Sequence, residues 1–283
     1  MAKTSGRLPA RAASRLAAAA IAAALVGTGA TAFAAEPADA PMFGVVGLDA
    51  AGASYYYAPT GEGGLTARTP LDTGWKDVTF AGRVDNDADG VADGRWQTNA
   101  AGILDYAAND GSDPEKVGHG WNIYDKLVAP GNLGGAEAGD LLGRDKSGYL
   151  YLYLGYGDGT VTKRYKVGGG WNAYTQLTGN GDLTGDGKND LVARDTSGVL
   201  WLYKGTGDYK APFATRTRIG GGWNAYNGLY ATGDIDLDGI TDLIARDKAG
   251  ALFLYKGTGK AAAPYASAVK IGNGGWNTYR LIF

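Results

Sequence analysis

The chain has 283 residues, of which 48 are glycine, one is histidine (His119) and none is cysteine. Such a chain cannot hold a disulfide framework, a thiol nucleophile, a cysteine metal site or a zinc-binding histidine cluster. The net charge is −2, and subtracting the four basic residues of the first 34, which contain no acid, leaves −6 for the rest. A mildly acidic protein of this kind is a poor candidate for binding nucleic acid or an anionic membrane.

Residues 1–34 are typical of a secretory signal peptide. The positive charges lie within residues 1–15, an apolar stretch follows from Leu16 to Val26, and Ala32-Phe33-Ala34 offers an A-x-A cleavage signal. A transmembrane anchor is the alternative, but the apolar run is shorter than the roughly 18 to 20 residues of a membrane span. We therefore predict cleavage near Ala34, a secreted extracellular protein without a membrane span in its mature form, and an acidic, Pro/Ala-rich linker at residues 35–41.

A motif of the form G-G-W-N-x-Y returns along the rest of the chain. Its tryptophans are spaced by 46, 50, 52 and 53 residues. They are Trp75, Trp121, Trp171, Trp223 and Trp276. This period fits a four-stranded propeller blade of roughly 40 to 50 residues and is too long for an ankyrin or leucine-rich repeat. The glycine excess, which has no collagen period, agrees with many tight turns and short strands.

The unit 172–223 shows the order of elements most clearly. Residues 172–174 open a first strand, an acidic loop covers 182–190, and Leu191 to Arg194 alternate as a second strand. A D-x-x-G turn at 195–198 leads to a third strand at 200–204, and a fourth strand lies at 217–219. The turn recurs at 49–52, 145–148 and 247–250, and with asparagine in place of aspartate at 99–102; its glycine accepts a positive φ.

Counting the repeats predicts an all-β, five-bladed β-propeller spanning residues 42–283. Four full units cover 76–121, 122–171, 172–223 and 224–276. Residues 42–75 hold only a second strand (43–48), a third (53–57) and a fourth that ends at Trp75, while residues 277–283 form only a first strand. Pairing these two fragments as a fifth blade closes the ring and removes exposed strand edges. An open array of five units is the alternative, and it leaves both ends unpaired.

Three units carry an acidic loop of the form D-x-[DT]-x-D-G-x-x-D, which predicts about three Ca²⁺ sites. Oxygen donors at alternate positions can surround one hard cation, and a carbonyl at the seventh position adds a ligand. The predicted ligands are Asp85, Asp87, Asp89, Val91 and Asp93, then Asp182, Thr184, Asp186, Lys188 and Asp190, then Asp234, Asp236, Asp238, Ile240 and Asp242. The twelfth position is Trp96, Ala193 or Ala245, not the glutamate of an EF-hand. Asp-rich turns without metal are the alternative.

The remaining loop of this kind has lost its acids. Asn132, Gly134 and Ala136 stand at the first three ligand positions, and only Asp140 is left. We therefore expect no calcium in this loop.

These residues resemble two families. The acidic loops followed by D-L-[VIL]-A-R-D, at 190–195 and 242–247, resemble the FG-GAP or VCBS repeats of integrin-type propellers, whose loops bind calcium. Residues 270–283, with their G-G-W-N signature, resemble the repeat of tachylectin-type lectins. That second resemblance implies five blades and one site per blade for N-acetylated amino sugars. The chain departs from the tachylectin pattern in three ways: Trp75-Lys76 replaces Trp-Asn, the strand after the tryptophan is less aromatic, and the calcium loops are additional. Integrin-type repeats, for their part, usually come in sevens.

The favoured function is a calcium-stabilised, non-catalytic module that binds a glycan or another cell-surface ligand. A sugar site needs an aromatic ring beside planar hydrogen-bonding groups, which the repeated motif supplies. The candidates are Trp121, Asn122, Tyr124, Trp171, Asn172, Tyr174, Trp223, Asn224, Tyr226, Trp276, Asn277 and Tyr279. The alternative for the tryptophans is a structural wedge between blades.

Two further functions are open. A protein–protein adhesion or scaffold module fits the integrin-type resemblance. A glycoside hydrolase would need paired carboxylates, and the acids outside loops and turns show no obvious pairing. These acids are Asp105, Asp110, Asp113, Glu115 and Asp158. His119 stands where the other units have glycine and is expected to be a turn substitution, so we predict no catalytic residues.

Overall fold

The computed structural model describes residues 40–283, which belong to one compact unit, Pro37–Phe283. The predicted signal peptide and residues 35–39 of the predicted linker lie outside the described residues. No helix among residues 40–283 combines the length and apolar character that a membrane crossing requires.

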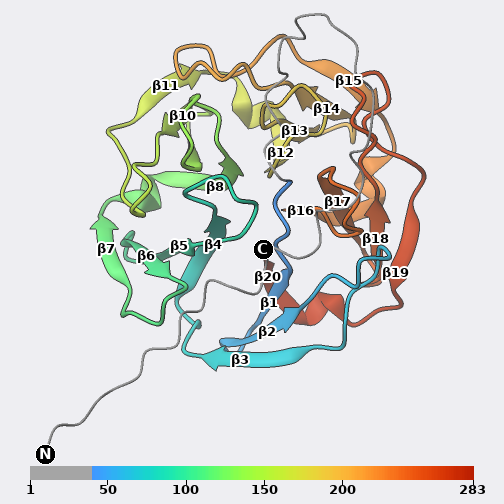
Figure 1. The fold of residues 1–283 in the computed structure, drawn as a ribbon, viewed down its shortest axis with the longest axis horizontal. Coiled ribbons are helices and arrows are strands. Elements are labelled where there is room, and N and C mark those ends of the chain that lie inside the picture. Colours follow the sequence, from blue (N-terminus) through green and yellow to red (C-terminus); the bar gives the residue numbers. More distant parts are fainter. Residues whose placement is uncertain (1–39) are drawn as a thin grey trace, which may run out of the picture. The chain divides into compact units, whose positions relative to one another are not determined.

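The described residues form five antiparallel sheets of four strands each, arranged in a ring (Figure 1). We number the sheets as blades 1 to 5 and give their strands from the ring axis outward. Blade 1 holds β20 (Tyr279–Ile282), β1 (Val45–Asp49), β2 (Ala53–Tyr57) and β3 (Thr69–Thr73). Blade 2 holds β4 (Val78–Val84), β5 (Gly94–Asn99), β6 (Leu104–Ala108) and β7 (Glu115–Gly118). Blade 3 holds β8 (Tyr124–Gly131), β9 (Asp140–Asp145), β10 (Leu150–Tyr153) and β11 (Tyr165–Gly168). Blade 4 holds β12 (Tyr174–Thr178), β13 (Leu191–Asp195), β14 (Leu200–Tyr203) and β15 (Thr217–Gly220). Blade 5 holds β16 (Tyr226–Gly233), β17 (Asp242–Asp247), β18 (Leu252–Tyr255) and β19 (Val269–Gly272).

The ring closes as the sequence predicts. Strand β20 pairs antiparallel with β1, with Asp49 opposite Tyr279 and Gly47 opposite Ile282. Beyond the strand, Val46 and Phe283 exchange two backbone hydrogen bonds of 2.7 and 3.0 Å. The predicted five-bladed, all-β propeller with a composite first blade is therefore confirmed.

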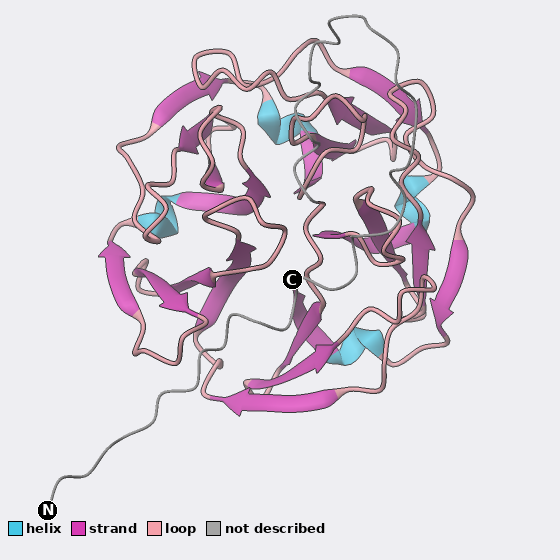
Figure 2. Ribbon diagram, viewed as in Figure 1, coloured by secondary structure: helices cyan, strands magenta, loops and turns pink. Residues whose placement is uncertain are grey.

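Two predicted details of the strands are wrong. The Trp-Asn-x triplets do not open strands; they form 3-10 turns η1 (Trp121–Ile123), η2 (Trp171–Ala173), η3 (Trp223–Ala225) and η4 (Trp276–Thr278), cyan in Figure 2. Each turn follows a glycine with a left-handed backbone, and the strand begins at the tyrosine. Residues Leu191 to Arg194 are also buried without alternation, because neighbouring blades cover both faces of the sheet.

The hydrophobic core lies in the seams, the spaces between neighbouring blades. Five clusters of buried side chains lie in the five seams, and each contains one tryptophan of the repeated motif. In the seam between blades 2 and 3, for example, Trp96 and Leu104 pack against Trp121 and Leu141. Each blade therefore depends on both neighbours for the burial of its apolar surface.

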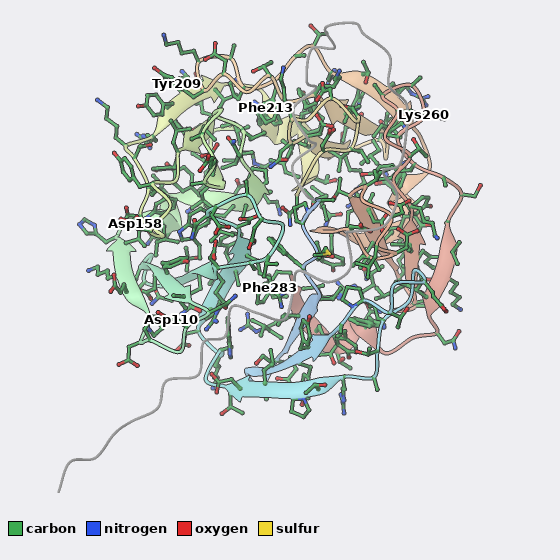
Figure 3. The ribbon with its side chains drawn as sticks, viewed as in Figure 1. Asp110, Asp158, Tyr209, Phe213, Lys260 and Phe283 are labelled. Carbon is green, nitrogen blue, oxygen red and sulfur yellow. The ribbon has the colours of Figure 1, made fainter. Side chains whose placement is uncertain are left out.

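The innermost strands β20, β4, β8, β12 and β16 surround a cavity of about 530 Å³, here called the axial cavity. Phe283 lies near the middle of the ring (Figure 3), and Phe43 also lines this cavity. Just before Phe43, the carbonyl of Pro41 accepts the N–H of Asp234 at 2.6 Å, and the N–H of Met42 donates to Gly90 at 2.9 Å. This segment thereby links two acidic loops from opposite parts of the sequence.

Candidate functional site

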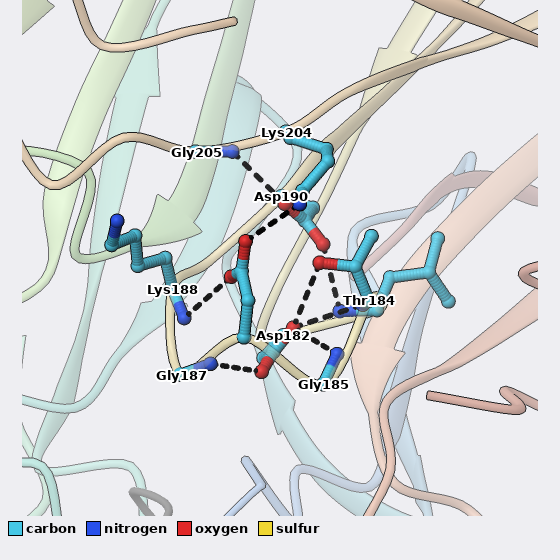
Figure 4. Close-up of polar contacts among 10 residues, drawn as sticks. Asp182, Thr184, Gly185, Gly187, Lys188, Asp190, Lys204 and Gly205 are labelled. Carbon is cyan, nitrogen blue, oxygen red and sulfur yellow. Dashed lines mark hydrogen bonds and ion pairs between the residues drawn. The ribbon is translucent and has the colours of Figure 1, made fainter. Parts of the chain in front are cut away.

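The three acidic loops connect the innermost strand to the second strand of blades 2, 4 and 5. In each, the first aspartate accepts the N–H of the sixth residue, a glycine. These bonds are Asp85 to Gly90 at 2.8 Å, Asp182 to Gly187 at 2.6 Å and Asp234 to Gly239 at 2.7 Å. The aspartate at the fifth position accepts the N–H of the seventh residue. These bonds are Asp89 to Val91 at 2.8 Å, Asp186 to Lys188 at 3.2 Å and Asp238 to Ile240 at 3.0 Å. Figure 4 shows this geometry for the loop of blade 4.

Two of the loops bring three carboxylates together. One oxygen from each of Asp85, Asp87 and Asp89 lies within 4.8 Å of the others, and the same holds for Asp234, Asp236 and Asp242. Asp93 and Asp238 are outside these groups. Among residues 40–283, the acids of the blade 4 loop do not form such a group, and there Thr184 Oγ1 donates to Asp182 at 3.4 Å.

The donor set at Asp234, Asp236 and Asp242 fits a hard cation such as Ca²⁺. All three donors are carboxylate oxygens, and Oδ1 of Asp236 is buried without a hydrogen-bond partner. A buried carboxylate oxygen without a hydrogen-bond partner is costly, and a bound cation would remove that cost. These residues, together with the carbonyl of Ile240, would hold the ion.

A lysine already compensates part of the charge in two loops. Lys204 Nζ lies 2.9 Å from Asp186 Oδ2, and Lys256 Nζ lies 2.6 Å from Asp236 Oδ2. Both lysines directly follow the third strand of their blade. The blade 2 loop forms no such ion pair among the described residues, so its three grouped carboxylates face one another without a neighbouring ammonium.

The aspartate at the ninth position has a structural role that the sequence did not reveal. Asp190 accepts the N–H of Leu183 at 3.0 Å and that of Gly205 at 2.9 Å, and so ties the loop to the next hairpin. Asp242 makes the corresponding bonds to Ile235 and Gly257. Burial raises the pKa of Asp190 to about 6 and that of Asp242 to about 7.

Asp140 keeps this structural role in the loop that lacks the other acids. Its carboxylate accepts the N–H groups of Leu133 and Gly134, both at 2.8 Å, and of Gly155 at 3.1 Å. Burial raises the pKa of Asp140 to about 6. The ninth position therefore serves the fold even in a loop whose first acid is replaced by Asn132.

The tryptophans of the repeated motif are packed in the seams. They are only 6–8% exposed, and four of the five indoles pack on a tyrosine ring at a centroid distance of 4.3 to 4.7 Å, whereas Trp75 packs on Phe283 at 6.0 Å. The pairs are Trp121 with Tyr153, Trp171 with Tyr203, Trp223 with Tyr255, and Trp276 with Tyr57. The hydroxyls of Tyr124, Tyr174, Tyr226 and Tyr279 bond the same four tyrosines at 2.5 to 2.7 Å. These aromatic residues therefore have a structural role, because they pack the seams between blades.

The asparagines of the motif are exposed, but they also hold a turn. Asn122, Asn172, Asn224 and Asn277 each lie against the glycine of the preceding D-x-x-G turn. A Cβ at Gly102 would lie 2.8 Å from Cγ of Asn122, so this position requires glycine for close approach as well as for its φ of 76°. Asn277 additionally donates to the carbonyl of Lys248 at 2.9 Å.

Sequence reasoning missed a set of arginines that join the blades, here called the seam arginines. Three come from the repeated D-L-x-x-R-D strand: Arg144, Arg194 and Arg246. In each, Nη1 donates to the carbonyl oxygens of the next tryptophan and tyrosine of the motif. Arg144 bonds Trp171 and Tyr174 at 2.9 and 2.6 Å, Arg194 bonds Trp223 and Tyr226 at 3.0 and 2.6 Å, and Arg246 bonds Trp276 and Tyr279 at 2.9 and 3.0 Å. The signal that could have revealed these contacts is an arginine that recurs in an otherwise apolar strand.

Blade 1 supplies its seam arginine from a different strand. The position of Arg246 is taken by Leu48 in β1, and Arg280 in the paired strand β20 donates instead to the carbonyls of Trp75 and Val78. The seam between blades 1 and 2 is thus joined by carbonyl contacts that correspond to those of Arg144, Arg194 and Arg246.

Two of the acids considered for catalysis make the contacts of ordinary turns. Asp110 and Asp158 lie on the outer hairpins of blades 2 and 3 (Figure 3). Each accepts an N–H two residues ahead at 2.9 Å, from Ser112 and Thr160 respectively. These contacts are those of ordinary turns.

Residues 182–245 match the family model described as an FG-GAP-like repeat. This segment is similar to an FG-GAP-like repeat. It begins at the acidic loop of blade 4 and ends in β17, after the acidic loop of blade 5. Together with the five-bladed ring, the match supports the predicted FG-GAP repeat propeller, and it does not confirm the resemblance to tachylectin-type lectins. No curated protein matches the chain in sequence.

Several solved structures have a similar chain trace. Prp20p from Saccharomyces cerevisiae, whose binding to Gsp1p and histones was examined, is 11% identical with a TM-score of 0.40, over 82% of this chain and 62% of that one. Human WBSCR16 is 11% identical with a TM-score of 0.34, over 68% and 51%. Regucalcin from Agrobacterium tumefaciens, a calcium-binding protein, is 13% identical with a TM-score of 0.41, over 81% and 74%. The chain spans less than two thirds of Prp20p and WBSCR16, and these scores carry no conclusion about function.

Proposed function

We propose that this FG-GAP repeat propeller is a secreted, calcium-stabilised and non-catalytic binding module whose favoured ligand is a carbohydrate. The observation that supports calcium best is the group Asp234, Asp236 and Asp242, with its buried and unpartnered Asp236 oxygen. The group at Asp85, Asp87 and Asp89 is the second site, and the loop from Asp182 to Asp190 is the third. Because the loops join adjacent strands, the ions act chiefly on the stability of the fold.

The axial cavity is the place on this molecule where a sugar fits best. Its wall combines the partly exposed rings of Phe80 and Phe283 with the side-chain amides of Asn122 and Gln176. Sugars present a weakly apolar face and several hydroxyls, so rings beside planar donors and acceptors suit them. Of the four predicted motif triplets, the one at Trp121, Asn122 and Tyr124 lines this cavity. N-acetylated amino sugars are the first ligands to test, because the G-G-W-N signature resembles that of tachylectin-type lectins.

Isothermal titration of the calcium-loaded protein with N-acetylglucosamine, N-acetylgalactosamine and glucose tests this proposal. We expect saturable binding of an N-acetylated sugar and a concentration-dependent rise in melting temperature, because a ligand of the folded state stabilises it. Gln176→Leu removes one amide from the cavity wall and should weaken binding by about tenfold. Tyr156→Ala, at an exposed residue outside the cavity, is the control. Absence of sugar binding would favour the adhesion or scaffold alternative.

A further inference from the structure

The seam between blades 2 and 3 differs from the other four because no arginine of residues 40–283 joins it. Strand pairing identifies the residue at the seam-arginine position. Thr98 pairs with Phe80 after a bulge in the innermost strand, just as Arg144 pairs with Lys126 and Arg194 with Gln176. Blade 1 compensates for Leu48 with Arg280, whereas the residue of blade 2 that corresponds to Arg280 is Thr79. Blade 2 thus has threonine at both positions.

The carbonyls that a seam arginine would bond are nevertheless in place. They belong to Trp121 and Tyr124, the motif residues that follow blade 2. Within residues 40–283, no side chain donates a hydrogen bond to either carbonyl. The axial cavity reaches this position, since Thr79, Thr98, Trp121 and Tyr124 all line it. We call this part of the cavity, which is lined by these four residues, the seam pocket.

We propose that the seam pocket binds a guanidinium group, either of a small molecule or of an arginine side chain on another polypeptide. The two carbonyls of Trp121 and Tyr124 would accept its N–H groups in the way that the carbonyls of Trp223 and Tyr226 accept those of Arg194. A planar guanidinium offers several donors in a fixed fork, which suits paired acceptors better than an ammonium does. This site is independent of the calcium loops, and it shares the axial cavity, including Trp121 and Tyr124, with the proposed sugar.

The same molecule shows that such a seam holds a guanidinium without a carboxylate. Arg194 is 8% exposed, and its remaining contact is from Nε to the hydroxyl of Thr175 at 3.1 Å. Thr79 corresponds to Thr175, and its hydroxyl lies 3.0 Å from that of Thr98. The seam pocket thus has two carbonyls and a hydroxyl equivalent to those that surround Arg194. A second hydroxyl, that of Thr98, stands at the chain position that corresponds to Arg194.

The charged residues that line the axial cavity are Arg83, Asp125 and Lys126. Asp125 is paired with Arg144 at 2.5 Å in the adjoining seam. The acceptors for a guanidinium are therefore the backbone carbonyls and the two hydroxyls, whereas Arg194 has two carbonyls and one hydroxyl. Shape and hydrogen-bond geometry, more than net charge, would select the ligand.

Binding of ethylguanidinium to the whole protein, measured by calorimetry and by protein NMR, tests the proposal. We expect saturable binding at one site and at least about tenfold weaker binding of ethylurea, its uncharged planar analogue. Thr98→Arg supplies the guanidinium from the chain, and it should raise the melting temperature and abolish the binding. Thr98→Met fills the pocket without adding hydrogen-bond donors, and it should also abolish binding. This second variant keeps the proposal testable if Thr98→Arg fails to fold.

The reverse experiment creates the same pocket in another seam. Arg194→Thr gives blade 4 the two threonines of blade 2, so it should lower the melting temperature and add a second ethylguanidinium site that restores part of the loss. Arg218→Thr, at an exposed residue, is the matched control. Tighter binding of acetyl-argininamide than of ethylguanidinium would point to a polypeptide as the source, and equal binding to a small molecule. No binding to the unmodified protein, or binding that survives both Thr98 variants, would overturn the proposal.

Discussion

The side chain of Arg194 crosses the seam between blades 4 and 5, where its Nη1 lies 3.0 Å from the carbonyl oxygen of Trp223. This guanidinium is buried, and desolvation lowers its pKa from the ordinary arginine value. Backbone carbonyls and a threonine hydroxyl compensate for the loss of water. One side chain thus fixes the start of the next blade, and the same contact recurs around most of the ring.

Replacing Arg194 by methionine should destabilise the protein strongly. The change leaves the carbonyls of Trp223 and Tyr226 without their charged donor, which costs about 2 to 4 kcal/mol of unfolding free energy. Chemical denaturation in calcium measures this loss. The control is Arg218→Met at an exposed position, expected to stay within about 0.5 kcal/mol of the parent protein. Equal effects of the two substitutions would show that the seam contact contributes nothing specific.

Leu237→Gly should stabilise the protein. Leu237 is the fourth residue of the blade 5 loop and has a φ of 61°, and the corresponding residue of the blade 4 loop is Gly185 with a φ of 75°. The left-handed conformation costs a non-glycine residue about 1 kcal/mol, so glycine should recover an amount of that order. Denaturation in EDTA gives the measurement free of metal effects. Val91→Gly, at a residue of similar exposure without a positive φ, should give no gain; a gain there would mean that the effect has another cause.

Asp140 should make the stability fall as the pH rises from about 4 to 7. Burial raises its folded-state pKa to about 6, above the ordinary value of roughly 3.9 in the unfolded chain, so the folded protein binds this proton more tightly. The folded state therefore loses about 2 to 3 kcal/mol relative to the unfolded state over that range, and the loss is complete above pH 7.

Comparing Asp140→Asn with the parent protein across this pH range in EDTA isolates this effect. The asparagine variant is neutral throughout and should show a flatter profile. Asp158→Asn, in an exposed turn, should leave the slope between pH 4 and 7 as it is in the parent. A profile of Asp140→Asn that runs parallel to the parent's would contradict the assignment.

The ring itself could be predicted from sequence because each unit carries the same tryptophan, turn and strand pattern. The tryptophan spacing gave the blade, and the incomplete first and last units gave the closure, which the pairing of Asp49 with Tyr279 bears out. The 3-10 turns were missed because Trp-Asn-x precedes an apolar strand and has no helical periodicity of its own. The seam arginines were missed because a charged residue inside a buried strand acquires its meaning only from the carbonyls of the next blade.

Some features of the candidate sites could likewise be predicted from sequence, and others could not. The alternate acids of the loops mark their positions in sequence, yet sequence cannot tell that Asp85, Asp87 and Asp89 gather while the acids of the blade 4 loop do not. It also cannot tell that Asp140 and Asp190 bind backbone amides of a neighbouring hairpin. The seam pocket exists because Thr98 stands where other blades have a seam arginine. This difference becomes visible only when the five blades are aligned by their strand pairing.

Calcium binding by the acidic loops is the central claim, and titration of calcium into the metal-free protein, followed by both heat and melting temperature, tests it most directly. We predict about three sites and a rise in stability of about 2.7 kcal/mol per site at a hundredfold excess over the dissociation constant. Asp236→Asn should remove one site, while Asp110→Asn, in an outer turn, should remove none. A metal-free protein whose melting temperature is unchanged by calcium, with no heat of binding, would contradict the account.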